Sequence, residues 1–374
     1  MKTKVLAFYL PQFHETEYNN EWWGKGFTDW VASKNATPLF KGHRQPRTPL
    51  DANYYDLSDE SAKAIAWQAS LAKSNGIDGF CIYHYWFPSG AYLDTPAQIL
   101  LNHSEIDIEY SFCWDSGSWK RTWTLSDKQS EILVQQDYGN RDRWKAHYEY
   151  LRPFFLDSRY IKINNRPVFH IYRSLRVECL NEMRKCWDEM ASQDGFDGVY
   201  IIAGDLEYRK DEEKFKAVDA FYNYEPNFSF SLQYGTIYNF GHLVIGAIKK
   251  RFNRLFGTLF LPDKRNAGHI FSVMERYVPA SCKKENLGIF TDYDDTPRRK
   301  GTGVVYCNNS VNLFKKAFRV QYEKSIANHS DFLYITAWNE WGESAYLEPD
   351  EEKEFAYLNV IKETVSDKNG TEVL

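Results

Sequence analysis

Short, almost continuous apolar runs recur along the chain, separated by stretches with apolar residues at three- and four-residue spacing. The runs are typical of parallel β-strands buried on both faces, and the stretches are typical of amphipathic helices. The eight predicted strands are Val5–Leu10, Gly79–Tyr85, Tyr110–Trp114, Pro167–Tyr172, Val199–Ala203, Ala220–Tyr224, Gly288–Thr291 and Phe332–Trp338. The clearest predicted helices are Ser58–Ser74, Asn140–Phe155, Leu175–Gln193 and Val311–Ala327.

Strands that alternate with helices imply a parallel sheet, and eight of them predict an α/β fold of the (β/α)₈ TIM-barrel type. An open doubly wound sheet is the alternative, but no glycine-rich phosphate loop follows the first strand. No linker or low-complexity segment divides the chain, so we expect one catalytic domain over residues 1–374. It includes a long active-site loop at 14–57 and an insertion at 227–287 after the sixth strand.

The aromatic content is high, at 17%, with 12 Trp, 26 Tyr and 25 Phe. Core packing accounts for most of these residues. Three clusters stand beside polar residues, at Trp22-Trp23, at Tyr83–Trp86 and at Trp338–Trp341. Aromatic faces with a few polar anchors match sugars, whose apolar faces are ringed by hydroxyl groups. We therefore expect these clusters to bind an oligosaccharide or polysaccharide, with Trp22 or Trp23 lining the cleft.

The charge balance narrows the list of partners. The net charge is −5 and the sequence pI is about 6.0, so there is no basic surplus to favour nucleic acid or an anionic membrane. No apolar run is long enough for a membrane span. The first residues predict a strand and not a signal peptide, and the six cysteines are scattered as in a reduced protein. These features predict a cytoplasmic location.

A polar or ionisable side chain follows every predicted strand. Because barrel active sites lie at the C-terminal ends of the strands, we expect these residues to converge on one mouth. In strand order they are Gln12 and His14, His84 and Trp86, Trp114 and Asp115, Tyr172 and Arg173, Asp205, Glu225, Asp292 and Asp294, and Asn339, Glu340 and Glu343. The candidate substrate-binding set is His14, Trp22, Trp23, His43, Tyr83, His84, Trp86, Trp114, Asp115, Tyr172, Asp205, Glu225, Asp294, Trp338, Asn339 and Trp341.

The strongest local signal is the segment Trp338–Glu343, in which two carboxylates leave the last strand within an aromatic frame. Cleavage of a glycosidic bond needs one carboxylic acid to protonate the leaving oxygen and a second group to support attack at the anomeric carbon. Glu340 and Glu343 are therefore the candidate catalytic pair. Spacing alone equally allows Glu343 to be an ordinary acidic residue in the first turn of the last helix.

The acidic stretch Asp292–Asp295 can also be interpreted as the metal-binding Asp-x-Asp motif of a nucleotide-sugar glycosyltransferase, although so short a pattern is weak. No His/Cys cluster has zinc spacing. We predict that the protein uses neither a metal nor a cofactor.

Long motifs carry a family resemblance along nearly the whole chain. They are Phe8–His14, Asn20–Trp30, Pro38–His43, Gly79–Phe87, Gln136–Gly139, Arg166–Phe169, Thr296–Arg299 and Trp338–Glu343. With these motifs the chain resembles the WbsX family of bacterial surface-polysaccharide loci, which is similar to glycoside hydrolase family 99, the endo-α-mannosidases.

The resemblance implies a retaining, metal-independent mechanism without a protein nucleophile. Glu340 would take the proton of the sugar's own 2-hydroxyl, which attacks C1 to give a 1,2-anhydro sugar. Glu343 would protonate the leaving oxygen and then assist water. This chemistry needs the 2-hydroxyl trans to the leaving group, and the resemblance therefore points to α-manno-configured sugars, D-mannose or L-rhamnose.

The chain departs from the family pattern at two places. Residues 114–119 read Trp-Asp-Ser-Gly-Ser-Trp where the family usually has Trp-Ala-Asn-Glu-Asn-Trp, and Tyr293 stands where Trp is usual. The catalytic pair is unchanged, but the sugar identity is open.

Three functions remain at this point. The leading one is cleavage or transfer of α-linked glycosides of a bacterial surface polysaccharide. The alternatives are a nucleotide-sugar glycosyltransferase of O-antigen or capsule assembly and a catalytically silent carbohydrate-binding barrel. Retention of both Glu340 and Glu343 weakens the last of these.

Overall fold

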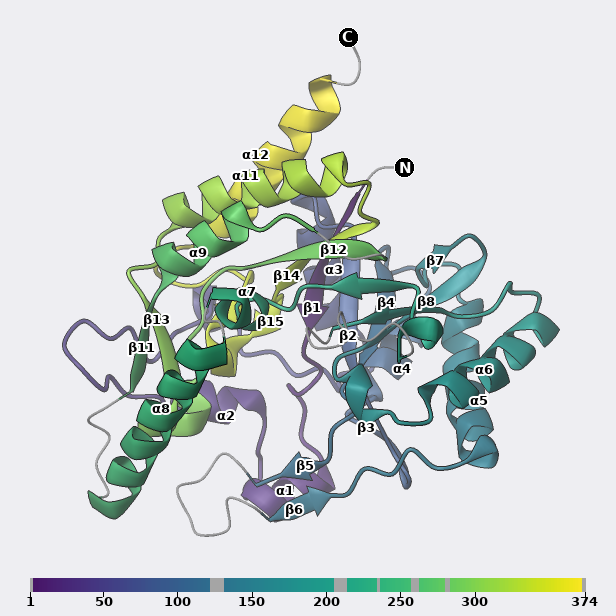
Figure 1. Cartoon of the computed structure of the whole chain (residues 1–374), viewed down its shortest axis with the longest axis horizontal. Coiled ribbons are helices and arrows are strands. Elements are labelled where there is room, and N and C mark those ends of the chain that lie inside the picture. The colour runs from purple at the N-terminus through teal and green to yellow at the C-terminus, as the bar shows by residue number, and fades with distance from the viewer. Residues whose placement is uncertain are drawn as a thin grey trace.

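The computed structural model describes residues 3–121, 131–204, 214–233, 236–256, 262–279 and 283–371. Eight parallel strands close into a barrel in the order β1, β2, β4, β8, β9, β10, β12, β14 and back to β1 (Figure 1). Ala7 marks the closure, because it is in register with Phe80 of β2 and with Ile335 of β14. The strands are β1 (Lys4–Tyr9), β2 (Gly79–Phe87), β4 (Glu109–Trp114), β8 (Arg166–Ile171), β9 (Tyr200–Ala203), β10 (Ala220–Tyr222), β12 (Lys284–Phe290) and β14 (Phe332–Thr336).

The predicted (β/α)₈ TIM barrel is confirmed, and each predicted strand overlaps a barrel strand. The seventh strand begins at Lys284 and not at Gly288, so the insertion ends earlier than expected. The apolar pattern did not predict the beginning of this strand, because its first residues are polar. Asn286 is buried, and its side-chain amide donates to the backbone oxygen of Phe221 and accepts from the backbone nitrogen of Phe332. These bonds let a polar residue occupy a buried strand.

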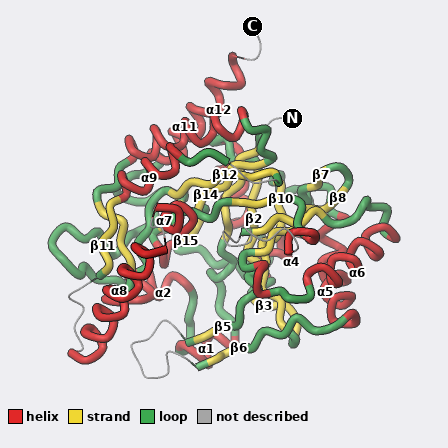
Figure 2. Tube along the Cα trace, in the orientation of Figure 1, coloured by secondary structure: helices red, strands yellow, loops and turns green. Residues whose placement is uncertain are grey.

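Helices surround the barrel (Figure 2). Two of the predicted helices begin later than expected, at Lys63 and at Leu180, while the other two match within one residue. The surrounding helices are α3 (Lys63–Ser74), α4 (Thr95–Asn102), α5 (Arg141–Leu156), α6 (Leu180–Gln193), α9 (Ala267–Arg276), α11 (Val311–Ala327) and α12 (Ala356–Thr371). In the described part of the chain, no helix has the length and apolar character needed to cross a bilayer.

Most of the remaining elements lie in the loops, many of them at the carboxyl ends of the barrel strands. The predicted loop 14–57 holds α1 (Glu17–Trp23), α2 (Asp29–Lys34) and the 3₁₀ turn η1 (Leu50–Ala52). The insertion after β10 holds α7 (Asn227–Gln233), α8 (Thr236–Phe256) and β11 (Asp263–Asn266), followed by α9. The others are β3 (Gly90–Tyr92), β5 (Trp119–Lys120), β6 (Ile132–Val134), β7 (Lys162–Ile163), η2 (Ser174–Arg176), η4 (Lys214–Ala217), α10 (Thr296–Arg299), η5 (Lys300–Thr302), β13 (Val304–Cys307), β15 (Asn339–Glu340), η6 (Trp341–Glu343) and β16 (Ala345–Tyr346).

Aromatic rings fill the barrel interior. The fully buried Phe8 contacts Tyr83, Tyr222, Tyr224 and Tyr334, with ring centroids 5.2–5.7 Å apart. Rings that meet at offset or tilted angles at this distance gain more than their buried area alone provides. Part of the high aromatic content is therefore structural, as expected.

The wall between β10 and β12 is too tight for a side chain at Gly288. A Cβ atom placed there would lie 2.0 Å from the backbone oxygen of Asn223. A backbone atom in a closed barrel has little room to move, because both neighbouring strands hold it. Close packing of the backbone therefore requires glycine at this position.

We predict that Gly288→Ala destabilises the protein by about 1–3 kcal/mol or more, because the strands must separate to admit the methyl group. The measurement is the free energy of unfolding in urea. Gly246→Ala is the control, since a Cβ atom at this helical position meets nothing within 4 Å. Equal stability of the two variants would contradict the packing argument.

Candidate active site

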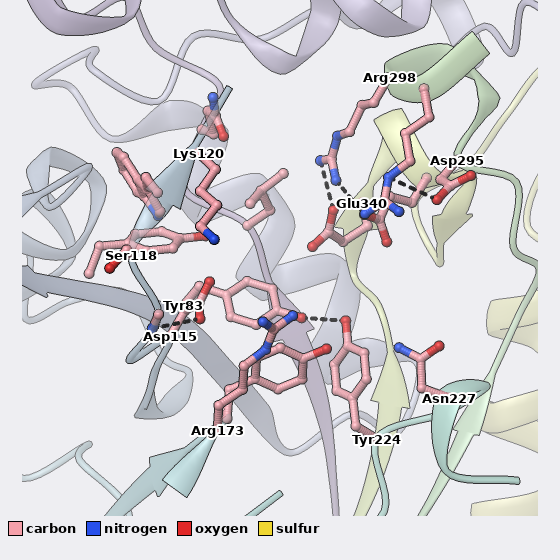
Figure 3. Close-up of a pocket in the computed structure, with 18 of the residues that line it drawn as sticks. Tyr83, Asp115, Ser118, Lys120, Arg173, Tyr224, Asn227, Asp295, Arg298 and Glu340 are labelled. Carbon is pink, nitrogen blue, oxygen red and sulfur yellow. Dashed lines mark hydrogen bonds and ion pairs between the residues drawn. The ribbon is translucent and has the colours of Figure 1, made fainter. Parts of the chain in front are cut away.

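A cavity of about 660 Å³ opens at the carboxyl end of the barrel (Figure 3). Its acidic lining residues are Asp115, Asp295, Glu340 and Glu343. Its cationic lining residues are Lys120, Arg173, Arg176, Arg265, Arg298 and Arg299. Its aromatic lining residues are Trp22, Trp23, Tyr83, Tyr85, Trp119, Tyr172, Tyr224 and Tyr293. A cavity of this size and lining can hold a ligand that presents both apolar faces and polar groups.

One buried guanidinium joins the two candidate catalytic carboxylates. Arg298 of α10 donates from Nη2 to Oε2 of Glu340 and from Nη1 to Oε1 of Glu343, each at 2.8 Å. Its Nε donates to Oδ1 of Asp29 on α2, at 2.9 Å. The rigid fork of arginine donors fixes the position of all three carboxylates.

Asp29 also holds the turn between the two glutamates. Its second carboxylate oxygen accepts the backbone N–H of Gly342, at 2.9 Å. A Cβ atom on Gly342 would lie 2.5 Å from Nε of Arg298 and 2.7 Å from the Asp29 carboxylate. Glycine in the Trp-Gly-Glu segment therefore lets the backbone approach this ion pair closely.

The charges around Arg298 are unbalanced, since one cation faces three carboxyl groups. Burial raises the pKa of Glu340 to about 8, Arg298 opposes the shift, and Glu343 and Asp29 add to it. Burial therefore favours the protonated form of Glu340 in the unliganded site. Glu343 lies in η6, well before the last helix begins at Ala356, which removes the alternative that it is a first-turn acid of that helix.

A second ion pair stands beside the first. Nε of Arg299 lies 3.1 Å from Oδ2 of Asp295. Burial raises the pKa of Asp295 to about 6, Arg299 opposes the shift, and the charge of Glu343 increases it. Asp295 also accepts the backbone N–H of Val304, at 2.6 Å, which ties α10 to β13.

The opposite wall carries hydroxyl groups and further charges (Figure 3). The hydroxyl oxygens of Tyr83 and Tyr224 are 2.7 Å apart. Asp115 follows β4 and accepts the backbone N–H of Gly117, at 3.3 Å. Burial raises the pKa of Asp115, and the nearby Arg173 opposes the shift.

Seven of the candidate catalytic and substrate-binding residues line the cavity, and both Trp22 and Trp23 are among them. They are Trp22, Trp23, Tyr83, Asp115, Tyr172, Glu340 and Glu343. Gln12 and Arg173, which also follow predicted strands, line it as well. Loop 14–57 thus contributes to the mouth of the barrel. Asp205 lies outside the residues that the structure describes.

The other predicted residues lie behind this lining. His84, Trp86 and Trp114 surround His147 of α5. The Nε2 atoms of His84 and His147 are 2.8 Å apart, and Trp86 stacks on His147. Burial lowers the pKa of His84 to about 3, so it is neutral. Trp86 and Trp114 line a separate niche of about 60 Å³.

The other predicted residues that follow the first and last barrel strands lie behind the cavity lining and make contacts inside the protein. Asn339 exchanges hydrogen bonds with the backbone of Leu10, and Trp341 donates from Nε1 to Glu348, at 2.6 Å. Trp338 is fully buried. The remaining positions are also internal. His14 contacts the backbone oxygen of Pro11, and Glu225 accepts from Ser229.

Asp292 and Asp294, which follow β12, are engaged in contacts inside the protein. Asp292 pairs with Arg47 at 2.8 Å. Asp294 accepts from Gln45 at 2.7 Å and lies at the same distance from Nε2 of His43, which places both His43 and Asp294 outside the lining. In the described residues, no group of three or more His, Cys, Asp and Glu side chains could hold a metal ion. Metal independence remains a prediction.

Sequence reasoning assigned no role to the residue at the centre of the site. Arg298 belongs to the Thr296–Arg299 motif, but its partners come from α2 and from the end of the barrel. Asp29, Tyr224, Asp295 and Arg299 were missed as well. The available signal was chemical, since two buried carboxylates require a cation nearby.

Known proteins resemble this chain in both sequence and fold. Two proteins described as "Uncharacterized protein WxcX", from two strains of Xanthomonas campestris pv. campestris, are each 27% identical over 367 residues, which is 97% of this chain. The chain spans about half the length of these curated relatives, since the match covers 49% of each.

Solved structures share the barrel. The GH99 endo-alpha-mannosidase from Bacteroides thetaiotaomicron matches with a TM-score of 0.59 and 13% identity, over 99% of this chain and 98% of that one. A "Glycoside hydrolase-like protein" matches with a TM-score of 0.56 and 14% identity, over 97% and 94%. At these identities the likeness shows a common fold. The family model described as "Glycosyltransferase WbsX" matches residues 5–361, and the chain therefore belongs to the WbsX family.

Proposed function

We propose that residues 1–374 form one catalytic domain that cleaves or transfers α-manno-configured glycosides, of mannose or rhamnose, in a bacterial surface polysaccharide. The observation that carries the proposal is the pair Glu340 and Glu343, which one buried guanidinium holds at the wall of a large, aromatic-lined cavity. Paired carboxyl groups at the carboxyl end of a barrel suit acid/base chemistry at an anomeric carbon.

In the first step, Glu340 as carboxylate takes the proton of the 2-hydroxyl, and O2 attacks C1. The bond from C1 to the leaving oxygen breaks, and that oxygen takes the proton of Glu343. The product is a 1,2-anhydro sugar, with Glu340 protonated and Glu343 ionised. No bond to the protein forms.

In the second step, water or an acceptor hydroxyl attacks C1, and Glu343 takes its proton. The bond from C1 to O2 breaks, and Glu340 returns its proton to O2. Both carboxyl groups regain their starting states, and the configuration at C1 is retained after two inversions. Water gives hydrolysis and an acceptor sugar gives transfer.

Arg298 supports this exchange of roles. In the unliganded site burial raises the pKa of Glu340 to about 8, which favours the protonated form of the residue that must act as the base. Arg298 donates to both carboxylates from separate nitrogens, so either of them can be its ionised partner. The reaction begins from the form in which the proton has moved to Glu343.

The proposed roles of Glu340 and Glu343 predict that variants at these two positions depend differently on the leaving group of the substrate. Glu343→Gln should slow substrates with poor leaving groups by about 10²–10⁴-fold, because protonation of the leaving oxygen is lost. Activated aryl α-mannosides or α-rhamnosides, which need little protonation, should lose much less. Glu340→Gln should be slow on every substrate, since the internal nucleophile is no longer deprotonated.

The measurement is kcat/KM over an aryl-glycoside series, with the exposed Glu351→Gln as control. Full activity of both variants would overturn the assignment of the pair. A 2-fluoro substrate should be inert with the unchanged enzyme. If it formed a covalent adduct on any Asp or Glu, the anhydro-sugar mechanism would be wrong, although the glycosidase class would survive.

The pH profile of Glu343→Gln isolates the base. With an activated aryl glycoside this variant needs only ionised Glu340, so kcat/KM should rise with pH and level off. The midpoint should lie below about 8, because the negative charge of Glu343 contributes to the raised pKa of Glu340 and is absent in the variant. A decrease of kcat/KM with rising pH would instead identify Glu340 as the acid.

The main alternative is a nucleotide-sugar glycosyltransferase, since the family description names a glycosyltransferase. The cationic wall at Lys120, Arg173 and Arg176 could face a diphosphate. We predict that iminosugars of manno or rhamno configuration raise the melting temperature, because ligands that bind the native state stabilise it. A rise with GDP-mannose or dTDP-rhamnose, and none with the iminosugars, would favour the transferase.

A further inference from the structure

Helix α8 presents a row of large apolar side chains to the exterior. Ile248, Leu255 and Phe256 are 62%, 69% and 63% exposed, and Val244, Ile245 and Phe252 are exposed beside them. At the 3.6-residue repeat these six positions fall within a sector of roughly 120°. A continuous exposed apolar stripe of this kind marks an interaction surface, because a folded chain normally covers it.

The charged residues of helix α8 indicate which kind of partner this surface binds. Residues 236–256 include Lys249, Lys250, Arg251 and Arg254 and contain no Asp or Glu, although the whole chain has a net charge of −5. Lys249 and Arg251 fall about 20° beyond the two edges of the apolar stripe on the helical repeat. An apolar stripe flanked by cations is typical of a helix that lies in the plane of a membrane interface.

The position of the helix relates this face to the catalytic cavity. Helix α8 contacts η5, which directly follows Arg298 and Arg299 of α10. Figure 1 shows α8 reaching outward at the lower left, on the side of the molecule where α1, α2 and β5 lie. A surface that binds α8 therefore lies next to the mouth of the barrel.

We propose that α8 docks the protein on an anionic lipid bilayer, with the apolar stripe inserted among the acyl chains and the flanking cations at the headgroups. The charge complementarity favours a bilayer over a second copy of this acidic chain. Docking would present the mouth of the barrel to glycans held at the membrane surface. This proposal does not depend on the chemistry of Glu340 and Glu343.

The test is co-sedimentation of the full chain with vesicles of phosphatidylcholine and phosphatidylglycerol in equal parts. We expect binding that weakens with added salt and is much lower on phosphatidylcholine alone. Ile248→Ser/Leu255→Ser should reduce the bound fraction about tenfold or more. Lys249→Gln/Arg251→Gln should weaken the preference for the anionic lipid, because two of the four cations of the helix are removed.

The control is Leu156→Ser/Val278→Ser, which removes exposed apolar side chains elsewhere and should bind like the unchanged protein. Absence of binding by the unchanged protein, or equal binding by Ile248→Ser/Leu255→Ser, would overturn the proposal. Sedimentation velocity without vesicles tests self-association. If the protein is a dimer that the same double variant dissociates, and it does not bind vesicles, the stripe is a subunit interface and the proposal is wrong.

Discussion

The contact on which the site depends is the buried guanidinium of Arg298 among three carboxyl groups. Asp29 holds it from the loop after β1, and Glu340 and Glu343 receive its other two donors at the end of the barrel. Removing one partner of a buried ion pair typically costs about 3–5 kcal/mol, because a charge is left without compensation. The same ion-pair contacts therefore determine both the stability of the protein and the arrangement of its reactive groups.

The barrel supplies the rigidity that this arrangement needs. Aromatic rings fill its interior around Phe8, and the β10–β12 wall has no space for a methyl group at Gly288. A close-packed interior transmits strain and does not absorb it. The carboxyl groups that follow β14 are thus held in place.

The sequence predicted the barrel well because parallel strands buried on both faces must be nearly continuous in apolar residues. It predicted the site only in part because side chains alternate across a strand. On β2, Tyr83 and Tyr85 face the cavity, while His84 and Trp86 point outward to His147. A list of strand-end residues does not reveal which face each one takes.

Contacts between distant loops could not be predicted from the sequence, for a different reason. Neither Asp29 nor Arg298 follows a barrel strand directly, and no local pattern pairs them. Asp294 shows the reverse case. It follows a strand, as expected, yet its carboxylate is turned to His43 and Gln45 and supports the loop instead of lining the cavity.

The distance along the chain between Asp29 and Arg298 has a consequence for biosynthesis. They are 269 residues apart in sequence, and Glu343 follows Arg298 by a further 45 residues. Strand β1 likewise pairs with β14 only when the final strand has left the ribosome. A nascent chain therefore carries Asp29 without its buried cation until Arg298 has been synthesised. Barrel closure and assembly of the carboxylate cluster follow together, once β14 and the segment up to Glu343 have been synthesised.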